Sequence, residues 1–386
     1  MIESGIVFLT VLIFIIGIVS SIENRFKWKI FDVLPSIVII YGLVMILSSL
    51  GLWSKNENIE SVYSSFKNTL LPSMIFLMLL EADIRTIAKL GKKMIFTFIL
   101  ATVSIMMGFI ISYGIFHNYL DGHEAWKSFG ALCGSWTGGT GNMIAVQGAL
   151  NISNNNMGYV LIADSINYTL WVMLLLALVP FAAKFNSWAK ADTSTIDAVS
   201  EKLNIQKNRS DISLSSLMLL LGSALMVNTA SEYLATLLPT TDFITHYTWV
   251  VMIATLAGIF FAMTPLAKIG GSSLIAQMML YFIVALIASR ADFSELAQAP
   301  LYIIAGFAVL VIHLILMMLF AKLFRLDLFT LGVASLANIG GVASAPILAS
   351  AYSKALVPIG VLMALMGYIV GTGAGLMVAK ILQILS

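Results

Sequence analysis

Charged residues are scarce in this sequence. Only 10% of its 386 residues are Asp, Glu, Lys or Arg, whereas 60% are hydrophobic. A soluble domain carries roughly 25% charged residues, so this chain could not cover its surface with side chains that water solvates. The composition therefore excludes an ordinary soluble enzyme. It predicts an integral membrane protein surrounded by the lipid bilayer, and we expect a bacterial plasma membrane.

Cysteine and histidine are scarce as well. The single cysteine, Cys133, excludes an internal disulfide and a multi-cysteine metal site, and the four histidines form no His-x-x-x-His pair. The net charge is +2 and no Lys/Arg-rich run could bind phosphates, so a nucleic-acid partner is not expected. Paired acids and a Ser/His couple are also missing. We therefore expect a protein that is not an enzyme and has no cofactor, except Na+ as a coupling ion.

Long apolar runs are what the sequence has instead. A helix needs about 20 mostly apolar residues to cross a bilayer, and only helices satisfy the backbone there without a closed barrel. The prediction is an all-α polytopic protein of about 11 to 13 transmembrane helices. Its organisation is a first transmembrane repeat (1–185), a polar linker (186–212) and a second transmembrane repeat (213–386). The apolar runs are 5–20, 33–53, 66–84, 93–116, 127–150, 157–185, 213–236, 246–265, 270–289, 300–322, 328–352 and 355–384.

Three matches between the halves predict an internal duplication. Residues 82–88 resemble residues 291–297, and Val160–Ala163 matches Val361–Ala364. A glycine pair also falls in the fifth run of each half, at Gly138-Gly139 and at Gly340-Gly341. The alternative is that apolar helices rich in Leu, Ile, Ala and Gly align by chance.

The basic residues suggest that the two repeats are inverted. In the first half they follow runs one and three, whereas in the second half they mainly follow runs two and four, with Arg290 after run three and Lys354 after run five as exceptions. Such a swap is typical of inverted-topology repeats. Six runs per half would make the repeats parallel, so inversion requires one crossing more or fewer. The residues concerned are Arg25, Lys27, Lys29, Arg85, Lys89, Lys92 and Lys93, against Lys268, Lys322 and Arg325.

Both glycine pairs predict interrupted helices. Each interior glycine costs about 1 kcal/mol relative to alanine in a helix, and unwound backbone in a membrane is tolerated where it lines a cavity. The alternative is close helix packing of the Gly-x-x-x-Gly type. We expect ion ligands at Thr137 and Asn142, and substrate ligands at Ser135, Trp136, Gly138, Gly139, Thr140, Gly141, Ser335, Asn338, Gly340, Gly341 and Ser344.

An ionisable residue follows the first glycine segment. Asp164 lies in an apolar run, where a charge is expensive and indicates a functional site. Asn167 is on the same helix face, and the two side chains offer oxygen ligands to a small cation or one protonatable carboxylate. The alternative places Asp164 near the helix mouth, in water.

Weaker candidates are given structural roles. Glu81 and Asp83 end an apolar run, and the recurrence of Asp83 as Asp292 predicts a helix-end cap. His313 is expected to hydrogen-bond a neighbouring helix, and Gln277 is expected to pack.

The order of these features resembles the superfamily of cation/proton antiporters and anion transporters. That resemblance implies two crossed, interrupted helices in an inverted repeat, and elevator-type movement of a core (93–185 and 300–386) against a scaffold. It also implies a homodimer. Many antiporters have Asp or Asn directly before the key Asp, whereas this chain has Ala163. The glycine motifs at 134–142 and 335–341 resemble, more narrowly, the YjcL-like family of uncharacterised membrane proteins.

Together these observations predict a secondary active transporter. It would carry a small polar or anionic organic solute, coupled to Na+ or H+. The alternative is a Na+/H+ antiporter without an organic solute. Two hypotheses from other functional classes are an intramembrane enzyme and a passive channel.

Overall fold

The computed structural model describes residues 1–26, 36–54, 56–120, 124–191, 211–241, 245–290, 299–353 and 356–386. Within these ranges helices dominate, and an isolated bridge joins Ile2 to Trp53. The predicted all-α polytopic class is confirmed. Most of the predicted linker at 186–212 lies outside the described residues, as do Lys27, Lys29, Asp292 and Lys354.

The helices of the first half follow the predicted apolar runs closely. One start differs, because Asn56 accepts a hydrogen bond from the Ile59 N–H (3.0 Å) and so begins α4 well before residue 66. The helices are α1 (Gly5–Phe26), α3 (Ser36–Ser49), α4 (Glu57–Leu79), α5 (Ile84–Ile87), α6 (Gly91–Phe116), α7 (Ala125–Gly138), α8 (Thr140–Leu150), α9 (Asn154–Leu178) and α10 (Ala182–Ala189).

The helices of the second half also follow the predicted apolar runs. Its first two helices begin at hydroxyl caps, Ser213 and Thr245, each with a reciprocal capping box. The helices are α12 (Leu214–Ala235), α13 (His246–Phe261), α14 (Ser272–Ala288), α15 (Ala299–Phe324), α16 (Leu328–Ile339), α17 (Gly341–Tyr352) and α18 (Val357–Leu385).

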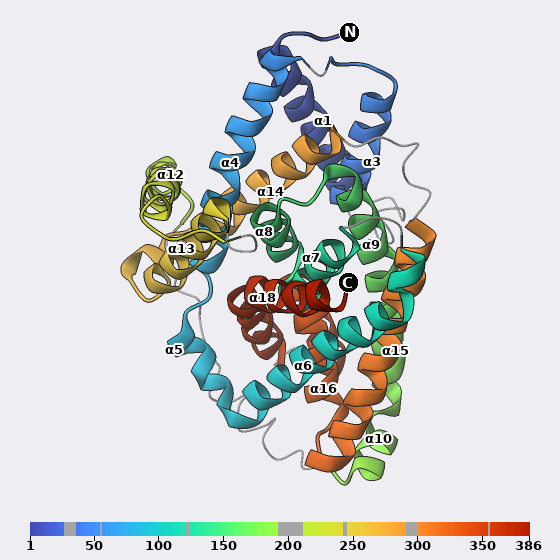
Figure 1. Ribbon diagram of the computed structural model, residues 1–386. Coiled ribbons are helices and arrows are strands. Elements are labelled where there is room, and N and C mark those ends of the chain that lie inside the picture. The colour runs from blue at the N-terminus through green and yellow to red at the C-terminus, as the bar shows by residue number, and fades with distance from the viewer. Residues whose placement is uncertain are drawn as a thin grey trace.

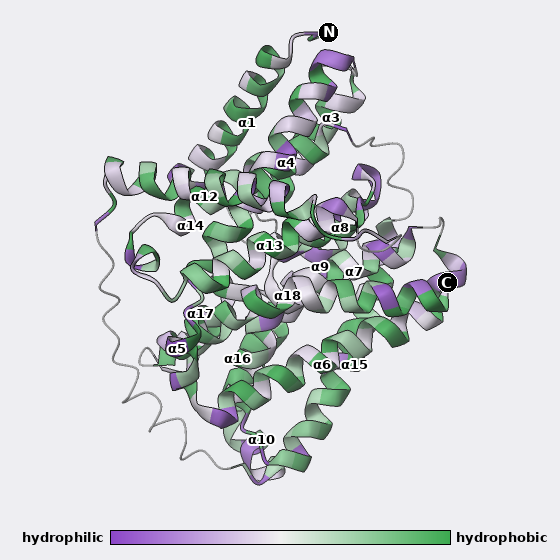
Figure 2. Cartoon of the chain, turned by 60° about the vertical axis from the view of Figure 1, so that its left-hand side comes forward, coloured by the Kyte–Doolittle hydropathy of each residue, from purple (hydrophilic) through white to green (hydrophobic). Residues whose placement is uncertain are grey.

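Within the part of the chain that the structure describes, six segments are long and apolar enough to cross a membrane. Figure 2 shows hydrophobic residues along most of the length of α6 and α15. On α15, Ile315 and Leu319 are exposed, as expected where lipid replaces water. The six segments are Gly5–Glu23, Ile84–Tyr119, Asn154–Ala189, Leu214–Ala235, Ala299–Phe324 and Val357–Leu385.

The helices pack in two groups. One contains α1, α3, α4, α12, α13 and α14, which contact one another and lie at the top and left of Figure 1. The other contains α6, α7, α9, α15, α16, α17 and α18, with α18 packed against α6, α7, α16 and α17. α8 lies between them and contacts α4 and α13 as well as α7 and α18. These groups are named the scaffold group and the core group below.

Two pairs of helices at matching places in the two halves pack antiparallel. In α4 and α14, Glu60 near one end pairs with Arg290 (2.7 Å), whereas Glu81 beyond the other end accepts from Ser272 Oγ (3.2 Å). In α6 and α15, the Phe96 ring contacts Phe324. Farther along α6, Ser112 donates to the Ala305 carbonyl (2.8 Å).

Each interrupted helix starts beside a carboxylate. Asp327 has a fully buried side chain, caps α16 through the Thr330 N–H (2.7 Å) and pairs with Lys93 of α6 (3.2 Å). Before α7, Glu124 pairs with Lys127 (3.0 Å), accepts from the Ser153 N–H (3.3 Å) and is 31% exposed. Partial burial raises the pKa of the Glu124 carboxyl, but Lys127 and Ser153 together outweigh this effect and hold that pKa below its usual value.

Candidate functional site

The first glycine segment interrupts a helix as predicted. α7 ends at Gly138 and α8 begins at Thr140. Between them Gly139 has φ +91° and ψ 173°, a conformation that is essentially restricted to glycine. The backbone therefore turns here without a side chain that would oppose the turn.

The other glycines of this segment allow close helix packing. A Cβ at Gly371 of α18 would lie 2.7 Å from Gly138 Cα, and a Cβ at Gly375 would lie 3.0 Å from Gly134 Cα. Such contacts are typical of small-residue interfaces between membrane helices. Both alternatives for this segment therefore apply. Gly139 interrupts the helix, whereas Gly134 and Gly138 allow close packing against α18.

Asp164 on α9 hydrogen-bonds the last turns of α7. Its Oδ1 accepts from Ser135 Oγ (3.0 Å) and from Trp136 Nε1 (2.8 Å). The carboxylate is partly buried. One turn later, the amide of fully buried Asn167 donates to the Ala163 and Ile303 carbonyls (2.9 and 3.2 Å). The Asn167 Oδ1 atom has no hydrogen-bond partner among the described residues.

Thr137 and Asn142 connect the interrupted helix to neighbouring backbone. Thr137 donates to the Cys133 carbonyl (2.7 Å). The Asn142 amide donates to the Gly138 carbonyl (2.7 Å), while its Oδ1 accepts from both the N–H and the hydroxyl of Thr372 on α18 (3.1 and 2.7 Å). Asn142 thereby supports the backbone on both sides of the break.

The second glycine pair also interrupts a helix. α16 ends at Ile339, Gly340 caps it, and Gly341 opens α17 with φ +59°. Just before the break, Asn338 Oδ1 accepts from Thr102 on α6 (2.7 Å). Ser344 is buried in the first turn of α17, directly against Gly340.

Ser335 belongs to a buried hydrogen-bonded chain that connects four helices. Its hydroxyl accepts from Trp171 Nε1 (2.9 Å) and lies 2.8 Å from His313 Nε2. His313 Nδ1 lies 2.7 Å from Ser104 Oγ, which donates to the Ala101 carbonyl (2.7 Å). Because Ser104 uses its proton on a carbonyl, it accepts from His313 Nδ1, and Nε2 then accepts from Ser335. The structure confirms that His313 bonds to neighbouring helices.

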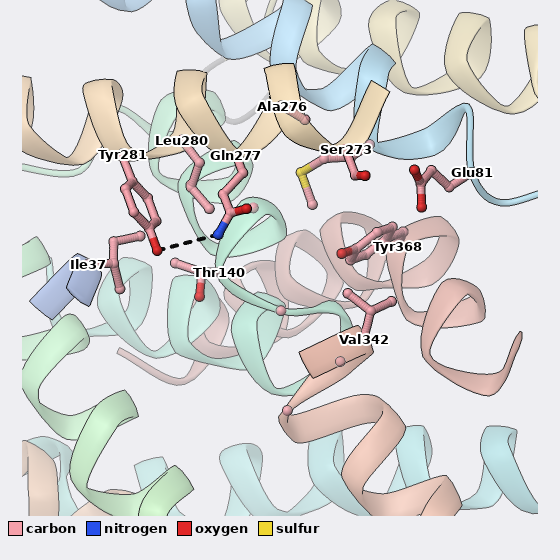
Figure 3. Close-up of a pocket in the computed structure, with 15 residues that line it drawn as sticks. Ile37, Glu81, Thr140, Ser273, Ala276, Gln277, Leu280, Tyr281, Val342 and Tyr368 are labelled. Carbon is pink, nitrogen blue, oxygen red and sulfur yellow. Dashed lines mark hydrogen bonds between the residues drawn. The ribbon is translucent and has the colours of Figure 1, made fainter. Parts of the chain in front are cut away.

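Both breaks open onto one cavity of about 310 Å³. Gly139, Gly340, the first residues of α8 and α17, and Tyr368 of α18 form one side, while the scaffold group contributes α3, α14 and the end of α4 (Figure 3). Asp164 is not among the described residues around it. The lining residues are Ile37, Met78, Glu81, Gly139, Thr140, Gly141, Ser273, Ala276, Gln277, Leu280, Tyr281, Gly340, Gly341, Val342 and Tyr368.

Five of the predicted substrate ligands are thereby brought together. Gly139, Thr140 and Gly141 line the cavity opposite Gly340 and Gly341, some 200 positions further along the chain. The other predicted ligands are not among the residues that line this cavity, and they are buried behind the two breaks. These are Ser135, Trp136, Gly138, Ser335, Asn338 and Ser344.

Sequence reasoning missed the scaffold wall of the cavity. Asp83 does cap a helix, since it accepts from the Arg85 N–H (3.0 Å) at the start of α5. Its neighbour Glu81 instead lines the cavity, as does Gln277, which donates to Tyr281 Oη (3.4 Å). One feature of the sequence could have indicated Glu81. It is an acid at the end of an apolar run, and the matching position in the second half is not acidic. Within the described residues, no group of three His, Cys, Asp or Glu side chains could hold a metal ion.

Comparison with known sequences assigns the family. The model of DUF819, described as a protein of unknown function, matches residues 10–385. The chain belongs to the DUF819 family. A related sequence is the "Uncharacterized membrane protein YjcL" of Bacillus subtilis (strain 168), which is 23% identical over 381 residues, 92% of this chain and 91% of the relative. Together with the six apolar spans, these similarities identify an integral membrane protein.

Proposed function

We propose that this DUF819 member is a secondary active transporter of a small polar or anionic organic solute, coupled to Na+ or H+. The observation that carries the proposal is the shared cavity, where both interrupted helices meet the scaffold group. Interrupted helices at matching places in two halves are the typical binding site of secondary transporters.

The cavity has the size that such a solute requires, and helix starts in its wall can bind polar groups. Its volume of about 310 Å³ is at the lower end of the roughly 300–1,000 Å³ of ligand pockets, far more than a bare cation needs. This volume favours an organic solute over a Na+/H+ antiporter that carries ions alone. The first residues of α8 and α17 line it, and helix starts offer N–H groups without intrahelical partners to polar or anionic groups.

The antiparallel helix pairs support inverted repeats. Among the described helices, with the four-residue α5 left out, α4 and α14 hold the third place in the two halves, and α6 and α15 hold the fourth. Matching helices of a parallel duplication would run the same way through the membrane, whereas those of an inverted repeat run oppositely. Six membrane crossings per half would make the repeats parallel, so inversion requires one crossing more or fewer than the number of apolar runs. The distribution of basic residues leads to the same requirement.

The location of the cavity supports elevator-type movement. It lies where the scaffold group meets the core group, and both breaks belong to the core side. Displacement of the core group along the scaffold group would carry the two breaks and a bound solute toward the other side of the membrane. The polar layers behind the breaks would move with them.

The coupling cation is assigned to the layer behind the first break. The Asp164 carboxylate, the Ser135 hydroxyl and the unpartnered Oδ1 of Asn167 supply oxygen atoms there. Oxygen ligands suit a small hard cation, and a lone carboxylate can instead take up a proton. Cation binding would act on the solute site through α7, because Asp164 holds the turn directly before the break.

The test is uptake into proteoliposomes. Vesicles containing the purified protein receive a mixture of radiolabelled small carboxylic and amino acids, with an inward Na+ gradient, an inward H+ gradient or neither. We expect uptake that depends on one gradient and loses that dependence in Asp164→Asn. Asp83→Asn is the control, since it removes a carboxylate that caps the short helix α5 outside the cavity.

Two results would count against the proposal. Absence of gradient-dependent uptake, together with unchanged fluxes in Asp164→Asn, would overturn it. A response of a trapped pH dye to Na+ alone, without any solute, would instead favour the antiporter.

A further inference from the structure

Helix α15, from the second half of the chain, adjoins the layer to which the coupling cation is assigned. It packs along α9, the helix that carries Asp164 and Asn167 (Figure 1). The Ile303 carbonyl of α15 accepts one hydrogen bond from the Asn167 amide nitrogen (3.2 Å), and the Ala163 carbonyl accepts another (2.9 Å). An amide nitrogen has two protons, so both of them are engaged. The oxygen of this amide is therefore left as an acceptor.

The Asn167 Oδ1 atom is buried without a hydrogen-bond partner among the described residues. An unsatisfied buried acceptor is unfavourable, and a bound cation would supply the missing partner. Residues three apart on a helix are neighbours, so one ion can reach this oxygen and the Asp164 carboxylate. An amide oxygen takes up no proton at physiological pH, whereas amide and carboxylate oxygens both bind hard cations. This pair of groups therefore favours Na+ over H+.

Gly306 of α15 provides the space that the Asn167 amide occupies. A Cβ at Gly306 would lie 2.6 Å from Asn167 Nδ2, which is too short for a real Cβ contact, and 3.6 Å from Trp136 Cη2. The closest atom is the end of a side chain and does not belong to the backbone. A methyl group at this position would therefore displace the amide, and the spacing of α9 and α15 could stay as it is.

We propose that Gly306 is a positioning residue for a Na+ site formed by Asp164 and Asn167. This inference rests on the proposed transport function and specifies its coupling ion. The missing side chain at Gly306 and the Ile303 carbonyl together fix the orientation of the Asn167 amide, which leaves its oxygen for the ion. The second half of the chain thereby contributes to the cation layer behind the first break.

Binding of Na+ to the purified protein tests the identity of the ion. Melting temperatures in detergent are measured over a series of NaCl concentrations at fixed pH, with choline chloride keeping the ionic strength constant. A ligand that binds only the folded state stabilises it increasingly as its concentration rises. We expect Na+ to stabilise the wild-type protein and expect Asp164→Asn to lose this response. The measurement needs neither a solute nor a membrane gradient.

Two glycine variants separate positioning from packing. Gly306→Ala should raise the Na+ concentration for half-maximal stabilisation about tenfold or more, as is typical when groups that orient metal ligands are changed. Gly108→Ala is the control, because its Cβ would lie 2.9 Å from Val309 Cγ1 and 3.0 Å from the Val309 carbonyl oxygen, which crowds α6 against α15. Overpacking should lower its melting temperature, while its half-maximal Na+ concentration should stay within about threefold of wild type.

A shorter side chain in place of Asn167 tests whether Gly306 acts through that residue. Asn167→Ser keeps an oxygen atom and leaves room for a methyl group at position 306. Adding Gly306→Ala to this variant should change the half-maximal Na+ concentration by less than about twofold, because the effects of residues in contact are not additive. An equal loss in both backgrounds would contradict the positioning role.

The inference is overturned if Na+ stabilises the wild-type protein no more than choline does, or if Gly306→Ala leaves the response to Na+ unchanged. Solute uptake that an H+ gradient drives in the absence of Na+ would also overturn it, and would leave the transport function intact. Absence of uptake under any gradient would instead remove the transport function, whereas Na+ binding in detergent would still be measured independently.

Discussion

The two interrupted helices have the same outline but differ in the polar groups behind each break. The α7–α8 break is held by Asp164, through Ser135 and Trp136. Behind the α16–α17 break, the corresponding layer contains Ser335 and His313 in a chain of neutral hydrogen bonds. Among the described residues, an ionisable acid is thus hydrogen-bonded to the last turns of the helix before the first break and not to those of the helix before the second. The match of Val160–Ala163 with Val361–Ala364 makes Leu365 the counterpart of Asp164.

This difference in polar groups suggests that the two breaks have different roles. A fully satisfied neutral network fixes a single arrangement and gives no response to cations. A partly buried carboxylate beside an unpartnered amide oxygen can change its state when a cation binds. Under the proposed function, the first break responds to the coupling ion and the second provides a constant wall of the cavity.

The largest expected effect comes from the start of the second interrupted helix. Asp327→Ala removes the cap of α16 and the ion pair between this fully buried carboxylate and Lys93. Loss of one member of a buried pair costs about 3–5 kcal/mol. We expect the melting temperature in detergent to fall by more than about 6 °C. A shift below about 2 °C would show that the second break does not depend on this anchor.

Close packing of α18 should matter next. In Gly371→Ala the new Cβ would lie 2.7 Å from Gly138 Cα, whereas a Cβ at Gly373 on the same helix meets nothing within 4 Å. Overpacking of this kind costs about 1–3 kcal/mol. Thermal unfolding should therefore show a destabilised Gly371→Ala and a nearly unchanged Gly373→Ala. Equal melting temperatures would contradict a glycine interface specific to the first break.

The glycines at the breaks themselves should differ from each other. Gly139 has φ +91° and ψ 173°, whereas Gly341 has φ +59°. The first conformation costs a non-glycine residue about 1–3 kcal/mol, and the left-handed helical value of the second costs about 1–2 kcal/mol. Gly139→Ala should lower the melting temperature more than Gly341→Ala. The reverse order would show that the second break is the more strained.

The smallest expected effect is at the start of the first interrupted helix. Glu124 is partly exposed and its pair with Lys127 is local, so Glu124→Gln should cost at most about 1 kcal/mol at neutral pH. Because the pKa of Glu124 is lowered on folding, its contribution is present above the pKa of the unfolded chain and is lost as pH falls through the folded value.

Melting curves of wild type and Glu124→Gln across this pH range provide the check. The difference between them should shrink as the pH becomes acidic. A difference that grows on acidification would contradict the assignment of a stabilising, ionised Glu124.

The sequence by itself determined the membrane setting, the helix positions and the two breaks. Scarce charge and long apolar runs require helices in lipid, and a glycine pair inside such a run marks where the helix ends. These are local properties, because propensity and hydropathy depend on residues close in the chain. The positive φ angles of Gly139 and Gly341 are also local, because glycine adopts them without steric cost.

Only the tertiary structure decided which polar residues meet. Glycines of the two halves line one cavity, and Glu81 joins them from the end of α4. Asn142 and Asn338 have similar sequence surroundings, but they hydrogen-bond to α18 and α6, respectively. Such contacts depend on how helices from distant parts of the chain cross, and hydropathy carries no information about those crossings. The candidate site is therefore formed by helix packing, and only the tertiary structure shows that Glu81 belongs to it.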